Sequence, residues 1–143
     1  MIVRCTSILS PMGDELTSHP AITVGEQYVV LTISASPGRD VRLRVYALRP
    51  EARDPHLGPP ALWRSEMFEV LSSRIPSNWC VDISGTGAIH IAPESWHRPG
   101  FWMDLVEWSP MSEVATRDYE RELRTILQEA HQEPSDSNGN ARE

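Results

Sequence analysis

The strongest constraint on the fold is a nearly unbroken run of apolar and β-branched residues at 27–35, which reads QYVVLTISA. A run of this length is too short to cross a membrane and is typical of a strand buried on both faces of its sheet. Turn-forming residues follow at 36–40, and residues 41–47 then alternate between apolar and polar side chains. Such alternation predicts a half-buried strand, so the two segments predict an antiparallel hairpin.

Other short β-rich segments along the chain predict further strands at 1–9, 67–71, 79–83 and 88–92. The turn 84–87, of sequence SGTG, joins the last two into a second hairpin. Within it we expect one buried apolar face, formed by Trp79, Val81, Ile83, Ile89 and Ile91. A proline-rich loop is expected at 49–62, and a short helix or a docked aromatic strap at 101–108.

A long helix is predicted at 110–132, because Ser109 can cap it and Pro110 suits its first position. Its apolar residues form one stripe, made of Ala115, Tyr119, Leu123, Ile126, Leu127 and Ala130. The polar tail 133–143 is predicted to be disordered. We therefore expect one mainly β (α+β) domain at 1–132. It would be a small SH3-like antiparallel barrel or a curled sheet of five to six strands, with a C-terminal α-helix.

The net charge of −7 arises entirely in residues 61–143, which hold seven arginines against fourteen acidic residues. This balance disfavours nucleic acid and anionic membrane as partners, and it favours a basic protein. No segment approaches the length of a transmembrane helix, and the N-terminus lacks a signal-peptide core, so a cytoplasmic location is expected. The two cysteines, Cys5 and Cys80, lie outside any CxxC spacing and are expected to be buried, reduced thiols.

The candidate catalytic and metal-binding groups are weak. His90, Glu94 and His97 could be ligands, but Pro93 and a loop separate them, so no metal site or cofactor is expected. The SGTG segment matches no phosphate loop or nucleophile turn, because a strand and not a helix follows it. An enzyme is therefore not expected, and a hydrolase or metal enzyme stays a remote alternative.

Two groups of residues could serve binding. The first is the basic set Arg39, Arg42 and Arg44, with Tyr46 beside it. Arg42, Arg44 and Tyr46 share one face of a predicted strand and could stack on bases, but the patch is short, so nucleic-acid binding is not favoured. Trp63 and Trp96 lie in predicted loops and could line the aromatic groove of a peptide-binding module.

Several phrases carry a family resemblance: ITVGEQYVVLTI at 22–33, FEV at 68–70 with IPSNW at 75–79, and PESW at 93–96 with PGFW at 99–102. In this order they resemble a family of small bacterial proteins with an SH3-like barrel, over roughly residues 3–127. Some members are similar to immunity proteins encoded beside polymorphic or contact-dependent toxins. The matching positions are turn and core residues, so the resemblance implies a fold and supplies no catalytic residue. The chain departs from the family in its longer loop at 49–62 and in lacking lysine.

The resemblance and the acidic half together lead us to expect an immunity protein that binds and neutralises a cognate toxin, itself a basic domain. The alternative is a small SH3-like adaptor or regulatory module of unknown partner. We expect the partner to bind the helical region through Asp104, Glu107, Trp108, Asp118 and Glu122.

Overall fold

The computed structural model describes residues 1–53, 57–107 and 109–132. Seven strands in this part of the chain form one antiparallel sheet: β1 (Ile2–Cys5), β4 (Gln27–Ala35), β5 (Arg42–Ala47), β6 (Leu62–Arg64), β7 (Phe68–Ser72), β8 (Trp79–Ile83) and β9 (Ile89–Pro93). Two short strands, β2 (Ile8–Leu9) and β3 (Glu15–Leu16), pair separately. The helices are α1 (Phe101–Val106) and α2 (Ser112–His131), with 3-10 turns η1 (Pro50–Ala52), η2 (Ser65–Met67) and η3 (Glu94–His97).

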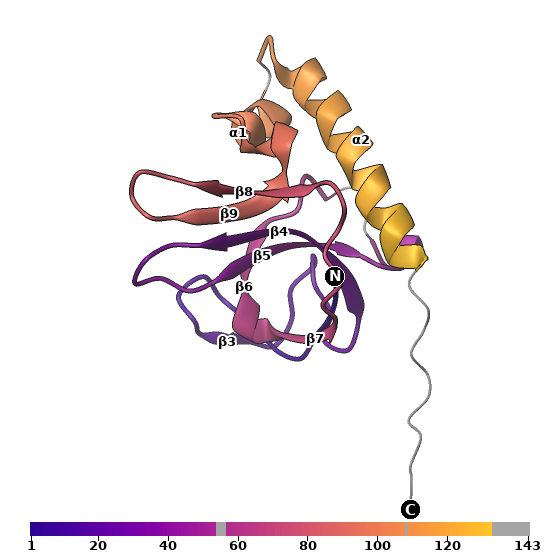
Figure 1. Ribbon diagram of the computed structural model, residues 1–143. Coiled ribbons are helices and arrows are strands. Elements are labelled where there is room, and N and C mark those ends of the chain that lie inside the picture. Colours follow the sequence, from indigo (N-terminus) through magenta and orange to yellow (C-terminus); the bar gives the residue numbers. More distant parts are fainter. Residues whose placement is uncertain (54–56, 108, 133–143) are drawn as a thin grey trace, which may run out of the picture.

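Strand β4 is the centre of the sheet, and β5 pairs along one of its edges. Two strands share the other edge, because β1 pairs with residues 27–29 and β9 pairs with residues 33–35. A β-bulge between Val30 and Thr32 separates the two halves. A bulge bends and twists its strand, so the two branches of the sheet diverge from this point. Figure 1 shows the β8–β9 hairpin on one side of β4 and β5, and β7 on the other.

The mainly β prediction with a C-terminal helix is confirmed, and of its two forms the curled sheet is the one observed. The closed barrel is wrong, because β7 and β8 each end a branch of the sheet without pairing with one another. The strand count of five to six is also too low. The missed strand is β6, a three-residue strand that begins at the end of the proline-rich segment. The predicted first strand at 1–9 is divided into β1 and β2.

The described residues form two apolar cores, one on each face of β4. The first contains Val3, Cys5, Ile8, Ile22, Tyr28, Val30, Leu43, Val45, Ala47 and Met67. The second lies between the sheet and the helices and contains Val29, Leu31, Ala92, Trp96, Phe101, Ala115, Ile126 and Ala130. The prediction that β4 is buried on both faces is therefore confirmed.

Helix α2 packs its predicted apolar stripe against the second core, which confirms the stripe. In Figure 1 the helix runs along one side of the sheet, with α1 near its first turns. It begins at Ser112, later than predicted, because Ser109 forms a turn before it and accepts a hydrogen bond from the Met111 N–H at 3.2 Å. None of the helices in the described ranges is long and apolar enough to cross a membrane. The predicted disordered tail 133–143 lies outside the described residues.

The β8–β9 hairpin is confirmed, with Val81 opposite Ile91 and Ile83 opposite Ile89. Its expected burial is wrong, because Val81 and Ile83 are 60% and 67% exposed and Ile89 is exposed as well. The hairpin extends beyond both cores, so no element in the described part of the chain covers this apolar face. Trp79, at the base of the hairpin, is half-buried and contacts both cores.

Candidate functional site

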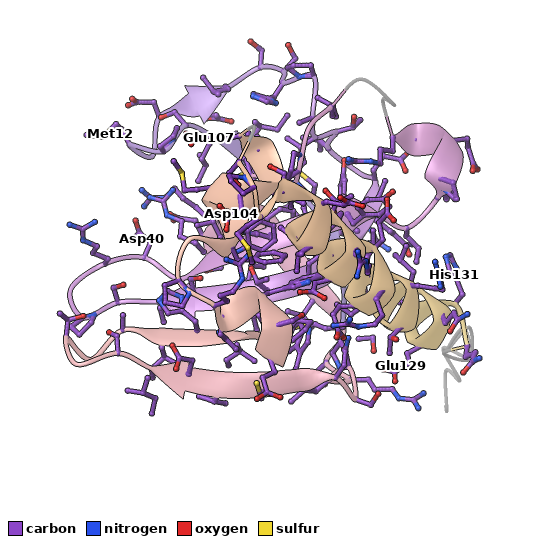
Figure 2. The ribbon with its side chains drawn as sticks, turned by 90° about the horizontal axis from the view of Figure 1, so that it is seen from above. Met12, Asp40, Asp104, Glu107, Glu129 and His131 are labelled. Carbon is purple, nitrogen blue, oxygen red and sulfur yellow. The ribbon has the colours of Figure 1, made fainter. Side chains whose placement is uncertain are left out.

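The predicted acidic face of the helical region is largely committed to contacts within the molecule. Asp104 accepts hydrogen bonds from Arg98 Nη1 at 2.6 Å and from Ser109 Oγ at 3.0 Å, and these lower the pKa of its carboxyl group. Glu107 is exposed and lies close to Asp104 in Figure 2. Trp108 lies outside the described residues.

The other two predicted carboxylates are on α2. Asp118 pairs with Arg121 at 3.0 Å. Glu122 accepts a hydrogen bond from Asn78 Nδ2 at 2.7 Å and also pairs with Arg121. Glu122 therefore anchors the segment that precedes β8 to the helix. A second contact of this kind lies further along α2. There the carboxylate of Glu129 accepts hydrogen bonds from the backbone N–H of Ser77, at 2.8 Å, and from the Ser77 hydroxyl.

The two loop tryptophans differ in exposure. Trp96 is 3% exposed and stacks on Phe101 and Tyr119, with Trp102 edge-on to it, so it cannot line an open groove. Trp63 is half-buried, and the ring of His19 meets it edge-to-face with 4.8 Å between the centroids. Of the two, only Trp63 keeps the exposure that an aromatic groove requires.

The predicted strand patch does not form an open platform for stacking bases. The Arg44 guanidinium lies over the ring of Trp102, 3.9 Å from its centroid, and Nη1 donates to the Pro60 carbonyl at 2.6 Å. Burial lowers the pKa of Arg44 to about 10, so the group stays charged at neutral pH. Tyr46 is covered by the guanidinium of Arg53, at 4.5 Å. The faces that a base would need are therefore occupied.

Of the possible metal ligands His90, Glu94 and His97, the two histidines lie within hydrogen-bond distance of other groups. His90 Nδ1 lies 3.1 Å from Ser34 Oγ, and His97 Nε2 lies 3.1 and 3.0 Å from the carbonyl oxygens of Cys80 and Ala92. Among the described residues, no group of three or more His, Cys, Asp or Glu side chains could hold a metal ion.

Both cysteines are free. Cys5 is buried as expected, and burial raises the pKa of its thiol. Cys80 is exposed, which corrects the expectation of two buried thiols, because β8 is an edge strand open on both faces. Desolvation, and after it the charges of Glu94 and Asp82, raise the pKa of the Cys80 thiol.

Two of the cavities on the described surface combine several chain segments with polar or aromatic side chains. The Trp63 cavity, of about 330 Å³, is lined mainly by apolar residues of the segments 9–21 and 57–64, with three arginines at its rim. Each arginine already has partners: Arg42 donates to the Pro11 carbonyl, Arg53 donates to the Gly58 carbonyl, and Arg64 pairs with Asp40.

The Arg44 cavity, of about 310 Å³, lies between the sheet and α1. Its floor carries polar side chains from neighbouring strands: Thr32 and Ser34 from β4, Arg44 from β5, His90 from β9 and Asp82 from β8. Its wall consists of η3, α1 and the residues between them, including Trp102, Met103 and Arg98. The bulge in β4 explains this floor, because it turns Thr32 and Ser34 to the helix side while Ile33 packs against the first core.

The floor contains a serine, a histidine and an aspartate in one row across three strands. Register places Asp82 opposite His90 and His90 opposite Ser34. The Ser34–His90 distance of 3.1 Å fits a nucleophile beside a base. A triad also needs the aspartate to orient the histidine, and the structure records no hydrogen bond between Asp82 and His90. The row therefore supplies hydrogen-bonding groups to the cavity and falls short of an activated nucleophile.

Sequence reasoning missed this floor. The sequence feature that could have indicated the cavity floor is the presence of Thr32 and Ser34 inside the most apolar strand, because polar residues buried in a strand need hydrogen-bond partners.

The outer edge of β8 is the third surface feature. In the described part of the chain β8 pairs with β9 alone, so its other edge is free. Apolar Val81 and Ile83 alternate there with Cys80 and Asp82, and all four are exposed. Neither Asp82 nor the neighbouring Glu94 forms an ion pair with another described residue. The edge therefore combines unpaired backbone groups, apolar side chains and negative charge.

A scan against protein-family models, a search of curated proteins and a search of solved structures found no match. The resemblance to the SH3-like immunity family stays a prediction.

Proposed function

We propose that this protein is a stoichiometric binding module of the immunity type, which captures a basic protein along strand β8. One observation carries the proposal: no second strand of the described chain pairs with β8, and its exposed side chains include apolar residues on either side of an acidic one. Proteins normally protect such edges, because an unpaired strand invites pairing with another chain. An edge left open and apolar is suited to strand addition by a partner.

The chemistry of the partner follows from the side chains on this edge. A strand added antiparallel to β8 would place its own residues opposite Val81, Asp82 and Ile83. Aliphatic residues opposite Val81 and Ile83, and Lys or Arg opposite Asp82, would pair favourably. Glu94 adds a second carboxylate nearby, as its effect on Cys80 shows. The chain's net charge of −7 would also steer a basic protein toward it and speed association.

This choice of surface differs from the helical face expected from the sequence. There, Asp104, Asp118 and Glu122 are engaged with Arg98, Arg121 and Asn78, so their charge is partly compensated within the molecule. Glu107 keeps its charge exposed and could extend the acidic surface. Binding through β8 leaves those intramolecular contacts intact.

The test is an affinity capture with the full chain and two variants, carried out in lysate of the native host. Ile83→Arg places a cation on the proposed edge, and Val24→Arg is the matched control, because Val24 is 53% exposed but lies in the segment before β4. We expect a basic protein to be retained by the wild type and by the control, and lost with Ile83→Arg.

The immunity part has its own readout. The captured protein should inhibit growth when expressed alone, and co-expression of this chain should relieve the inhibition. If the captured basic protein did not inhibit growth, the proposal of a binding module would stand, but the proposed immunity function would be wrong. Equal capture by Ile83→Arg, or capture of an acidic protein, would refute the β8 surface.

The Trp63 cavity favours a second candidate, the small adaptor module. It offers Trp63, Leu62 and adjacent prolines in an apolar hollow large enough for a peptide side chain. Loss of a partner with Trp63→Ala and not with Ile83→Arg would decide for this alternative.

A further inference from the structure

We propose that the Arg44 cavity binds a small organic carboxylate with a planar apolar body. This inference is independent of partner binding at β8, because the cavity lies between the sheet and α1 and is lined by other side chains, Asp82 apart. Three observations support it: a half-buried cation without a carboxylate partner among the described residues, buried polar groups without partners there, and apolar walls.

The cation is Arg44. Its guanidinium presents five N–H donors, and the described residues supply it with one acceptor, the Pro60 carbonyl. No carboxylate of the described chain forms an ion pair with it, although six other described arginines do pair with Asp or Glu. Stacking on Trp102 fixes the plane of the guanidinium and directs its remaining donors. A fixed, charged fork of this kind matches a carboxylate, which can accept two parallel hydrogen bonds.

The unpartnered polar groups lie around the same cavity. Thr32 is 5% exposed, it is the residue paired with Arg44 across the sheet, and its hydroxyl has no hydrogen-bond partner among the described residues. Arg98 donates from Nη1 to Asp104, but its Nε and Nη2 are buried without acceptors. Buried polar groups normally find partners, so these donors point to an acceptor that the protein itself does not supply.

The apolar part of the ligand follows from the walls. Trp102, Met103 and Leu62 line the cavity, and Met103 and Leu62 are exposed. Trp102 belongs to an aromatic cluster with Trp96, Phe101 and Tyr119, which holds its ring in place. A flat ring could pack against these side chains while its carboxylate met Arg44.

Volume and charge limit the ligand further. A cavity of about 310 Å³ is at the small end of known ligand sites, which excludes a nucleotide-sized molecule. Arg98 is partly neutralised by Asp104. Asp82 lies three strands from Arg44, which corresponds to about 14 Å at the usual strand spacing of about 4.8 Å. One full cation beside a distant carboxylate suits a singly charged acid better than a phosphate dianion.

The experiment is an NMR titration of the full ¹⁵N-labelled chain with benzoate, read on the indole N–H signals and on the backbone of β4 and β5. Benzylamine, benzyl alcohol, acetate and inorganic phosphate are the comparison probes. We expect saturable benzoate binding within about 10 mM and binding at least about tenfold weaker for each comparison probe. Arg44→Gln should weaken benzoate at least about tenfold, since a charge-assisted bond is lost.

Two further variants test whether benzoate binds in the Arg44 cavity. Arg42→Gln is the matched control, because Arg42 lies two residues away on the same strand but lines the Trp63 cavity, and it should bind benzoate as the wild type does. Thr32→Val keeps the shape of the side chain, so the variant should fold, and it should weaken benzoate about three- to tenfold by removing one hydroxyl. Four results would each overturn the proposal: no saturation by benzoate, equal binding of benzylamine, tighter binding of phosphate, or equal effects of Arg44→Gln and Arg42→Gln in folded protein.

Discussion

Thr32 allows a sharp test of the energetics, because its hydroxyl is buried in the central strand and has no hydrogen-bond partner in residues 1–53, 57–107 and 109–132. Leaving a buried hydroxyl unsatisfied costs about 1–3 kcal/mol in proteins. Valine occupies nearly the same space, is also β-branched and suits a strand at least as well. Thr32→Val should therefore stabilise the free protein. We expect a gain of about 1 kcal/mol, at the lower end of the range, because the residue borders an open cavity.

The gain can be measured by urea unfolding followed through tryptophan fluorescence. With a slope of about 2 kcal/mol/M, a gain of about 1 kcal/mol raises the midpoint by about 0.5 M. Thr6→Val is a control of opposite sign, since Thr6 Oγ1 donates to the Met67 carbonyl at 3.0 Å and valine loses that bond. It should lower the stability by about 1 kcal/mol. A Thr32→Val protein less stable than the wild type would refute the reasoning, because the hydroxyl would then have a partner in the free protein.

Three further predictions concern other parts of the molecule. Burial raises the pKa of Tyr119 to about 12, against about 10 for an exposed tyrosine, so the unfolded chain ionises first and stability falls as the pH rises from about 10 to about 12. The total loss of stability from this ionisation is at most about 2.7 kcal/mol. Urea midpoints measured at about pH 9 and about pH 11 should show the loss in the wild type and not in Tyr119→Phe. An equal loss in both proteins would contradict the assignment of the loss to Tyr119. Asn78→Ala removes the bond to Glu122 and should cost about 1–2 kcal/mol in urea unfolding, whereas the exposed Ser73→Ala should change stability by less than about 0.5 kcal/mol. Cys80 should react with a thiol reagent in the native state while Cys5 does not, and Asp82→Asn should speed the reaction by lowering the pKa of Cys80; an unchanged rate would exclude the carboxylate as a cause.

The hairpins could be predicted from sequence because their signals are local. Alternation over 42–47 and the turn before it define β5 and its pairing with β4. The same reasoning failed for the burial of β8, because alternation shows that a strand has an apolar face without showing what covers it. Val81 and Ile83 have the pattern of core residues, yet they lie beyond the reach of either core.

The candidate sites were harder to predict, because they depend on contacts between distant segments. The sequence indicates Arg44 as a strand residue that could stack on bases. Its observed stacking on Trp102 joins residues 58 positions apart, and no local pattern indicates such a contact. Likewise, the acidic residues of the helical region are visible in the sequence, but their partners Arg98 and Asn78 lie outside α2. The number of charged residues could therefore be predicted. Which of these charges lack a partner within the molecule depends on the packing and could not be predicted.

The bulge in β4 links the fold to both proposed surfaces. Without the extra residue, strict alternation from Val30 onward would place Thr32 and Ser34 on the side of the first core, and Ile33 on the floor of the Arg44 cavity. The bulge reverses these positions, because it leaves Leu31 in the second core and turns the next residue, Thr32, to the same side, toward the helices. It also lies where β1 ends on the shared edge of β4 and β9 begins, so the bend it causes separates the two branches. The same local irregularity thus places polar groups on the cavity floor and separates the β8–β9 hairpin from the branch formed by β1 and β7. In the described part of the chain, the outer edge of β8 is therefore open to a partner.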